Sequence, residues 1–395
     1  MVLEPNFALV LAGGGARGAY EAGVLRFILR DLPGRIGHPV RADLICGSSV
    51  GGINGAAIAA RNGTPEGPEQ LSDFWTGLAC ADVYKFVALD LLRSPMRLLR
   101  GPANQESAWV DATPLHTLME TTFPWAELHG VIERGELTAL VLTATDVNSG
   151  QVVQFIDGKL DPASLETHTG VRRVYTRIDH RHVLASCAIP FLFPPVNIDG
   201  HPMVDGSLRQ NTPISPALRM GAEHVLVIGT KYPRAPPEPE PITDGDLPST
   251  PALLGKALNA LLLDPLHQDI ARIDLINSIL SAGTSEYGPD FVANINRHLK
   301  ENLSRRLRPI NTLCIHPSEN LAKIAKDVWD PKAIQATRGT RFMLSTIAGE
   351  SNESDLLSYM LFDSAYTAVI EDLGYNDAKA RETEIVNFLE RVQGS

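Results

Sequence analysis

Two glycine-centred stretches, Gly13-Gly14-Gly15-Ala16-Arg17-Gly18 and Gly47-Ser48-Ser49-Val50-Gly51, decide how this chain folds. Each follows a short apolar run and precedes a segment with helical spacing. The run Phe7–Ala12 is typical of a fully buried strand, and residues 43–46 predict a second one. Strand, helix, strand and helix in short succession favour a parallel sheet that is covered by helices.

The rest of the chain continues this alternation. The first helix is expected over Arg17–Asp31, with Pro33-Gly34 as its end, and the second over Ser49–Ala60. Further strands are predicted at Ala139–Thr145, Val152–Ile156, His224–Gly229 and Leu313–His316, the first two joined by a hairpin turn at Asn148-Ser149-Gly150. Later helices are predicted at Ala252–Leu263, Leu266–Ser281, Pro289–Arg305 and Pro331–Ile347.

Composition narrows the class of protein. The 395 residues, 44% hydrophobic and 21% charged, suit one large or two ordinary soluble domains. The formal net charge of −11 argues against a nucleic-acid partner, because such binding rests on a basic surface. The sequence predicts neither a transmembrane helix nor a signal peptide, so a cytoplasmic or membrane-peripheral location is expected. The cysteines are expected to be buried free thiols, since they lack zinc-like spacing: Cys46, Cys80, Cys187 and Cys314.

The pattern G-x-S-x-G places Ser49 on a tight turn between a strand and a helix. Its flanking glycines admit a strained backbone, and the helix N-terminus favours negative charge. The peptide N–H groups of Gly14 and Gly15 could hold the oxyanion of an acyl-transfer intermediate. Arg17 either orients this loop, attracts an anionic head group, or is a solvated helix residue.

The first stretch also matches G-x-G-x-x-G, the pattern of a dinucleotide-binding loop. A dinucleotide site predicts an acidic residue at the end of the second strand. Asp31 comes too early, and Asp43 begins that strand rather than ending it. A non-catalytic nucleotide-binding module is therefore the alternative to an enzyme.

A serine nucleophile needs a neighbouring base. A triad of the α/β-hydrolase kind would take a late histidine. The histidines considered are His201, His224, His267, His298 and His316. The turn Asp205-Gly206-Ser207 is the other candidate, although an Asp-Gly pair is also a common structural turn.

Taken in this order, these motifs resemble those of the patatin-like phospholipases, a family of lipid acyl hydrolases. Residues 185–190, Phe193-Pro194 and Asn211-Thr212-Pro213 add to the likeness, which runs from Phe7 to Pro213. The resemblance implies a Ser–Asp dyad without histidine, with Ser49 as nucleophile and Asp205 as base. The site residues implied are Gly13, Gly14, Gly15, Arg17 and Gly18 in the oxyanion loop, Gly47, Ser48, Val50 and Gly51 in the nucleophile turn, and Gly206 and Ser207 in the base turn. Ser207 departs from the family, which often has glycine or alanine there.

The expected fold is a three-layer α/β/α sandwich around a mostly parallel sheet. Residues 5–215 would form the catalytic core, and residues 216–395 a helix-rich continuation with a proline-rich loop at 233–251. The expected activity is hydrolysis of phospholipid or lysophospholipid acyl esters, with no cofactor and no metal. Residues 146–150 lack the glycine and the late glutamate at the positions that a calcium loop requires, and they predict a turn.

Residues 84–100 are the predicted point of contact with a lipid surface. They combine apolar side chains with a basic rim, which suits an anionic membrane. Pro95 divides the segment and argues against one continuous helix. The alternative is a helical pair packed on the core.

Overall fold

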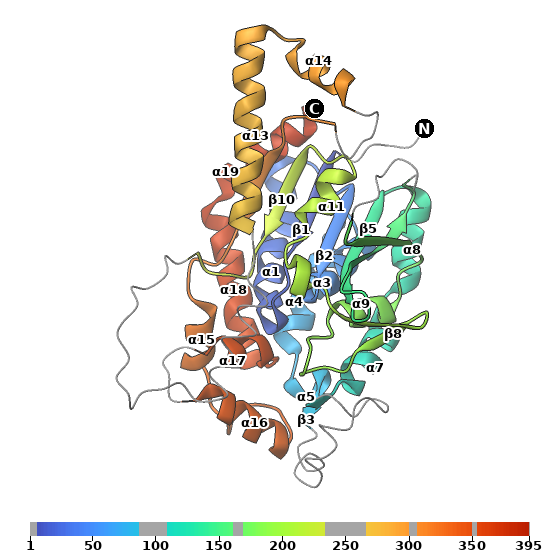
Figure 1. The fold of residues 1–395 in the computed structure, drawn as a ribbon. Helices are drawn as coiled ribbons and strands as arrows, with labels where there is room; N and C mark the ends of the chain where they lie inside the picture. Colours follow the sequence, from blue (N-terminus) through green and yellow to red (C-terminus); the bar gives the residue numbers. More distant parts are fainter. Residues whose placement is uncertain are drawn as a thin grey trace, which may run out of the picture.

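The computed structural model describes residues 6–86, 109–160, 169–233, 266–299, 306–349 and 354–394. A nine-stranded sheet crosses the described part of the molecule, with helices in front of it and behind it (Figure 1). Its order is β11-β10-β1-β2-β5-β6-β7, and β9 pairs with both β5 and β8. The strands of this sheet are β1 Phe7–Leu11, β2 Leu44–Ser48, β5 Ala139–Asp146, β6 Val152–Gly158, β7 Val171–Tyr175, β8 Val196–Ile198, β9 His201–Asp205, β10 His224–Ile228 and β11 Asn311–Ile315.

The centre of the sheet is parallel and buried on both faces. Strands β11, β10, β1, β2 and β5 run in the same direction, and β6 returns antiparallel to β5. Along β1, Leu9 and Leu11 join one apolar core, while Ala8 and Val10 join the core on the opposite face. Two covered faces explain why these strands are continuously apolar. The predicted α/β fold around a mostly parallel sheet is confirmed.

Each of the two glycine stretches leads from a strand into a helix, the first after β1 and the second after β2. After the short turn η1 (Gly15–Arg17) comes α1 (Gly18–Leu25), and α3 (Val50–Ala60) follows β2. The other helices are η2 Arg26–Asp31, α2 Pro33–Ile36, α4 Glu66–Gly77, α5 Cys80–Val83, α7 Thr113–Thr122, α8 Trp125–Arg134, α9 His180–Ser186, α10 Ser207–Gln210, α11 Ile214–Arg219, α13 Leu266–Tyr287, α14 Phe291–His298, α15 Leu321–Asp327, α16 Arg338–Ala348, α17 Asp355–Met360, α18 Ser364–Ala380 and α19 Glu382–Gln393. Two short strands, β3 Lys85–Phe86 and β4 Val110–Asp111, form a separate antiparallel pair.

The sequence predicted that the first helix ends at Pro33-Gly34, but the helical path continues beyond these residues. Helix α1 passes into the π-helical segment η2, where the Leu32 N–H donates to the carbonyl of Phe27 at 2.9 Å. The chain then continues as α2. This helix ends at Gly37, whose φ is 81°. Pro33 is tolerated because it stands at the first position of α2, where a missing N–H breaks no intrahelical bond.

Among the other predicted elements, one hairpin is confirmed and one helix starts later than predicted. The β5–β6 hairpin is confirmed, with Ala139 opposite Gly158. The helix expected from Pro331 begins only at Arg338, where the Thr337 side chain accepts the N–H of Thr340 as an N-cap. Residues 252–263, 300–305 and nearly all of 233–251 lie outside the described residues.

Helix α18 from the C-terminal half packs along α1 at close range. A Cβ at Gly23 would lie 1.8 Å from the carbonyl oxygen of Glu371, and one at Gly374 would lie 2.1 Å from that of Tyr20. The contact therefore requires glycine on both helices. Arg26 also pairs with Glu371 at 2.7 Å. The C-terminal helices thus shape the environment of the first glycine stretch.

Candidate active site

Two strands meet end to end beside β5 and bring a serine to an aspartate. Strand β2 runs parallel to β5 and stops with Ser48 opposite Thr143. Strand β9 runs toward it from the other end and stops with Asp205 opposite Ala144. Since Thr143 and Ala144 are neighbours in β5, the residue after Ser48 must face Asp205.

Ser49 occupies a strained turn. Its φ of 52° and ψ of −127° are unusual for a residue with a side chain. A Cβ added at Gly47 would lie 2.3 Å from the carbonyl oxygen of Gly51. A Cβ added at Gly51 would lie 2.5 Å from the carbonyl oxygen of Leu11. The two glycines of the motif are therefore needed for close backbone packing. The Ser49 N–H donates to Ser186 Oγ at 2.9 Å, which fixes the turn.

The Ser49 hydroxyl donates to Asp205 Oδ2 at 2.7 Å. Both residues are buried, Asp205 fully and Ser49 with 3% of its surface exposed. The other carboxylate oxygen, Oδ1, accepts the N–H of Ser207 at 2.7 Å. Burial raises the pKa of Asp205 from 3.8 to about 6, although the Ser49 and Ser207 hydrogen bonds oppose the shift. The arrangement is a serine hydroxyl hydrogen-bonded to a carboxylate of raised basicity.

The turn after Asp205 also depends on small residues. A Cβ at Gly206 would lie 2.2 Å from the carbonyl oxygen of Thr143, so the chain can pass this strand only with glycine there. The Ser207 hydroxyl lies 3.4 Å from that of Ser48. The structure therefore places the nucleophile turn and the base turn in direct contact.

The glycine-rich loop lies against the same point, and its amides differ in availability. The Gly13 N–H donates to the Asn211 carbonyl at 3.0 Å, and the Arg17 N–H to that of Gly14 at 3.2 Å. The Gly18 N–H also donates within the loop. Within the described part of the chain, the N–H groups of Gly14 and Gly15 have no acceptor. Of the five predicted loop residues, these two keep an amide free for a ligand.

Gly15 is fixed by its surroundings. Its φ is 56°, and an added Cβ would lie 2.3 Å from the carbonyl oxygen of Tyr359. Gly15 also lines a pocket together with Ser49. The loop therefore holds a free amide at the edge of the space that the serine faces.

Arg17 is neither solvated nor turned toward a head group. It is 5% exposed, donates to Ser358 Oγ at 2.9 Å and pairs with Asp355 at 2.9 Å. Its guanidinium lies 4.2 Å from the ring centroid of Tyr359. Of the three roles expected from the sequence, the structure supports the orientation of the loop, through α17 in the C-terminal half.

A narrow apolar pocket of about 30 Å³ opens at Ser49. Among its walls are Val50, Ile53, Trp75, Phe193 and Phe362. This volume holds about two water molecules. The pocket thus has the polarity that suits a hydrocarbon chain, but its walls must move to admit one.

A buried polar chain supports one wall of this pocket. The Trp75 ring N–H donates to the side-chain oxygen of Asn54 at 2.8 Å, and the Asn54 amide donates to Glu21 at 2.8 Å. Burial raises the pKa of Glu21 well above its usual value. The hydrogen bond from Asn54 offsets part of the cost of burying this carboxyl group.

Two of the five histidines considered for the alternative triad have identified partners, and His316 directly follows β11. His201 pairs with Asp146 at 3.1 Å, and His224 lies 3.0 Å from the Asn311 amide. His298 stands on α14, and the side chain of His267 lies outside the described residues. The hydrogen-bond partner found for the Ser49 hydroxyl is instead a carboxylate.

Two residues at the site were missed as functional candidates, although their stretch was noted. Ser186 Oγ accepts the Ser49 N–H and donates to the carbonyl of Thr143 at 2.6 Å. Cys187 follows it and lines the pocket. Burial raises the pKa of the Cys187 thiol well above its usual value, and the charge of Asp205 adds to the effect. Cys187 is therefore a thiol next to Ser49 rather than a competing nucleophile.

The sequence profile of the patatin-like phospholipases matches residues 9–218. The chain belongs to this family. Two curated relatives, both named lysophospholipase NTE1 and from two strains of Cryptococcus neoformans var. neoformans serotype D, are 24% identical to this patatin-like chain over 231 residues. The match covers 56% of this chain and 11% of each relative, so the chain spans a small part of the length of those proteins.

Solved structures that match this chain include VipD from Legionella pneumophila and human GIVD cytosolic phospholipase A2. VipD is 12% identical with a TM-score of 0.35, over 94% of this chain and 67% of its own. The human enzyme is 12% identical with a TM-score of 0.44, over 98% of the patatin-like chain and 60% of its own.

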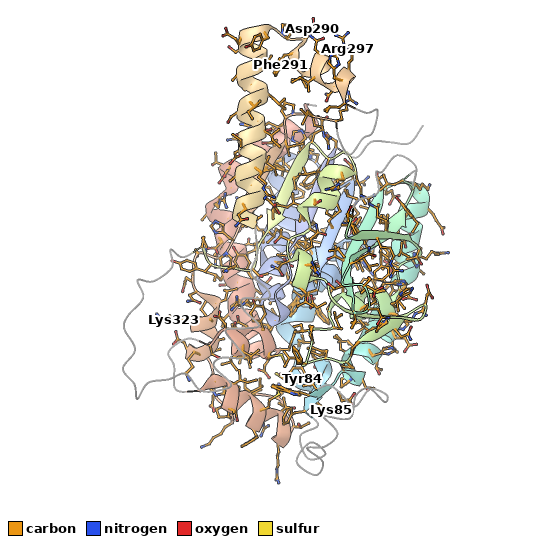
Figure 2. The ribbon with its side chains drawn as sticks, in the orientation of Figure 1. Tyr84, Lys85, Asp290, Phe291, Arg297 and Lys323 are labelled. Atoms are coloured by element: carbon orange, nitrogen blue, oxygen red, sulfur yellow. The ribbon has the colours of Figure 1, made fainter. Side chains whose placement is uncertain are left out.

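The predicted lipid-contact segment of this patatin-like chain falls mainly on residues 87–100, which lie outside the described residues. At its start, Tyr84 is fully buried and its hydroxyl donates to the carbonyl of Met360 at 2.7 Å, so this residue belongs to the core (Figure 2). Among the helices that are described, none has the length and apolar character needed to cross a membrane.

Proposed function

We propose that the chain hydrolyses acyl ester bonds in phospholipids or lysophospholipids through a serine acyl-enzyme. Ser49 is the nucleophile and Asp205 its base. The observation that carries the proposal is the 2.7 Å hydrogen bond between the Ser49 hydroxyl and Asp205, at the mouth of an apolar pocket. A nucleotide-binding module would have no use for this pair.

The chemistry requires few groups. Asp205 takes the hydroxyl proton while Ser49 Oγ bonds to the ester carbon, and the carbonyl electron pair moves onto the oxygen. The N–H groups of Gly14 and Gly15 support that oxyanion, each donor contributing roughly 2.7–4 kcal/mol. The oxyanion collapses, the alcohol leaves with the proton from Asp205, and water then repeats the sequence on the acyl-enzyme. A base pKa of about 6 suits this proton transfer near neutral pH.

The pocket and the relatives support the choice of substrate. The apolar walls fit a fatty acyl chain once they move apart. The curated relatives are named lysophospholipases, which supports the same choice. We therefore propose lysophospholipids as the preferred class within phospholipid esters.

Labelling with a fluorophosphonate followed by peptide mapping tests the assignment. We expect the label on Ser49, its loss in Ser49→Ala, and release of fatty acid from lysophosphatidylcholine by the unmodified chain. Ser48→Ala is the matched control, because its hydroxyl lies beside Ser207 rather than Asp205, and it should still be labelled. Label on another residue, or full turnover by folded Ser49→Ala, would refute the mechanism.

We further propose that residues 5–215 and 216–395 act as one domain, and that residues 84–100 make transient contact with a membrane. The pairing of Arg17 with Asp355 supports the proposal of one domain.

The proposed membrane contact is tested by flotation with anionic liposomes, which should weaken when Leu91 and Leu92 are replaced by aspartate. Unchanged flotation would contradict the membrane contact without affecting the assignment of Ser49.

A further inference from the structure

Three side chains with metal-binding atoms converge between α7 and α9. His116 and Glu120 stand one turn apart on α7, and His180 is the first residue of α9. One ligand atom from each lies within 4.8 Å of the other two. His116 Nδ1 and Glu120 Oε2 are 3.7 Å apart, and the rings of His116 and His180 have centroids separated by 4.9 Å.

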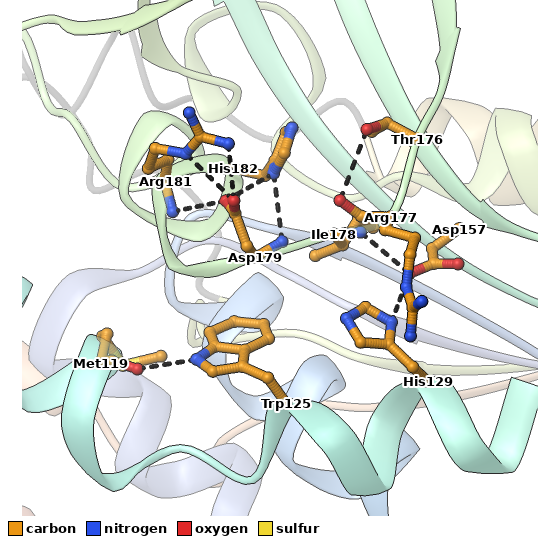
Figure 3. Close-up of polar contacts among 10 residues, drawn as sticks. All are labelled: Met119, Trp125, His129, Asp157, Thr176, Arg177, Ile178, Asp179, Arg181 and His182. Atoms are coloured by element: carbon orange, nitrogen blue, oxygen red, sulfur yellow. Dashed lines mark hydrogen bonds and ion pairs between the residues drawn. The ribbon is translucent and has the colours of Figure 1, made fainter.

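The backbone that carries these side chains is held in place by its neighbours. The Asp179 carboxylate accepts the Arg181 N–H at 2.9 Å and lies 2.8 Å from His182 Nδ1, which fixes the first turn of α9 (Figure 3). The Trp125 ring N–H donates to the Met119 carbonyl at 2.9 Å, which ties α7 to α8. These contacts hold the two segments that carry His180 and His116.

We propose that His116, Glu120 and His180 bind a divalent cation of the zinc class. Imidazole nitrogen and carboxylate oxygen are ligands that Zn²⁺ accepts, at about 2.0–2.2 Å. Two tetrahedral ligands at such distances stand about 3.3 Å apart, close to the observed separation of His116 and Glu120. Glu120 supplies a negative charge, and water completes the fourth position.

Access to this site is open. The side chains of His116 and Glu120 are 47% and 55% exposed, so a hydrated cation can reach them directly. The mixed nitrogen and oxygen set selects against Mg²⁺, which prefers oxygen ligands in octahedral geometry.

The position of the site gives it a consequence for the pocket. Leu115, next to His116 on α7, lines the pocket, and so do Cys187 and Ile189, which follow α9. A cation that bridges the two helices links two walls of a pocket that must widen to admit an acyl chain. This consequence rests on the proposed function, whereas the binding itself does not.

Calorimetric titration of the full chain with zinc chloride, without lipid, tests the binding. We expect one saturable site, at least tenfold weaker in His116→Ala and in His180→Ala, by comparison with the cost of losing even an outer-shell partner. Glu120→Gln should weaken it in the same direction. His298→Ala is the matched control, because His298 is an exposed histidine on α14, and should bind as the unmodified chain does.

Thermal unfolding gives a second readout that does not depend on catalysis. Zn²⁺ should raise the Tm of the unmodified chain and of His298→Ala but not of His180→Ala, and Mg²⁺ should raise none of them. Absence of saturable binding, or binding that survives both His116→Ala and His180→Ala in folded protein, overturns the proposal. Failure of lipid hydrolysis leaves this result standing, because no arm of the test uses a substrate.

Discussion

Asp205 lies directly beyond Ser48 along the edge of β5, at the end of a strand that points back at β2. Ser48 pairs with Thr143, and Asp205 pairs with the next residue, Ala144. The distance between Ser49 and Asp205 is therefore set by backbone hydrogen bonds of the sheet. The Asp205 carboxylate is held from its other side by the Ser207 N–H, which donates to Oδ1 at 2.7 Å.

The raised pKa of Asp205 predicts the pH dependence of ester hydrolysis. The base must be ionised to accept the Ser49 proton, and its pKa is about 6. We expect kcat/KM to fall about tenfold per pH unit below pH 6 and to level off above it. A profile measured with a non-ionising ester checks this, and a flat line through pH 6 would contradict the role of Asp205.

Asp205→Asn is expected to stabilise the fold while abolishing turnover. Because the folded pKa of about 6 exceeds the ordinary 3.8, the folded state holds more protons between these values, and stability falls as pH rises through that window. Asparagine lacks this penalty. Its side-chain oxygen can still accept the Ser207 N–H, and its NH2 group can donate to the Ser49 hydroxyl, which reverses the direction of that hydrogen bond. The free energy of unfolding at pH 7.5 should rise by about 3 kcal/mol.

Urea unfolding at two pH values isolates this effect. At pH 3.5 the difference between Asp205→Asn and the unmodified chain should nearly vanish, because both forms are then uncharged at this position. A variant that is less stable than the parent at pH 7.5 would show that the carboxylate contributes favourable contacts that outweigh its burial.

Arg17→Met is expected to cost about 1.5–3 kcal/mol of stability, the range for hydrogen bonds to charged groups. It removes the bonds to Ser358 and Asp355 and the contact with Tyr359. Arg30→Met is the matched control, since Arg30 pairs with Glu69 at the surface and should cost about 0–1 kcal/mol. Equal losses of unfolding free energy in the two variants would contradict the bracing role of Arg17.

Gly15→Ala tests the oxyanion loop. The new methyl group would meet the Tyr359 carbonyl at 2.3 Å, so the loop must shift and its free amide with it. We expect kcat to fall by about 10²–10³, the effect of losing one oxyanion donor. Gly37→Ala is the control for backbone strain alone, because its φ is 81° and nothing lies within 4 Å of the added Cβ.

The comparison of these two variants separates two causes. Gly37→Ala should cost about 1–2 kcal/mol of stability, from the left-handed backbone, and leave activity unchanged. Normal kcat in Gly15→Ala would exclude its amide as an oxyanion donor.

Local patterns predicted the parallel core, because short apolar runs closed by glycine leave few alternatives. The position of Ser49 on a turn between a strand and a helix was also predictable, because its motif combines a strand end, two glycines and the start of a helix. The continuation past Pro33 was not predictable, because proline in a helical pattern usually ends the helix, whereas here it stands at the first position of α2, directly after η2 and Leu32. The delayed start at Arg338 reflects a cap by Thr337 that competes with the apolar pattern.

The partners of Arg17 could not be found from the sequence, because Asp355 and Ser358 lie in a region without a motif. The sequence also did not show which N–H groups of the glycine-rich loop are engaged in hydrogen bonds and which are free. This division depends on Asn211, whose carbonyl takes up the N–H of Gly13. Local spacing identifies which residues can donate, but tertiary contacts decide which of them are already engaged.

The pairing of Arg17 with Asp355 spans 338 positions of the chain. At ribosomal speeds of 5–20 residues per second, roughly 20–70 s separate the synthesis of these two residues. During that interval the nascent polypeptide carries Ser49 and the glycine-rich loop without the ion pair between Arg17 and Asp355. The full set of contacts around the glycine-rich loop therefore forms only after Asp355 has been synthesised, long after Ser49.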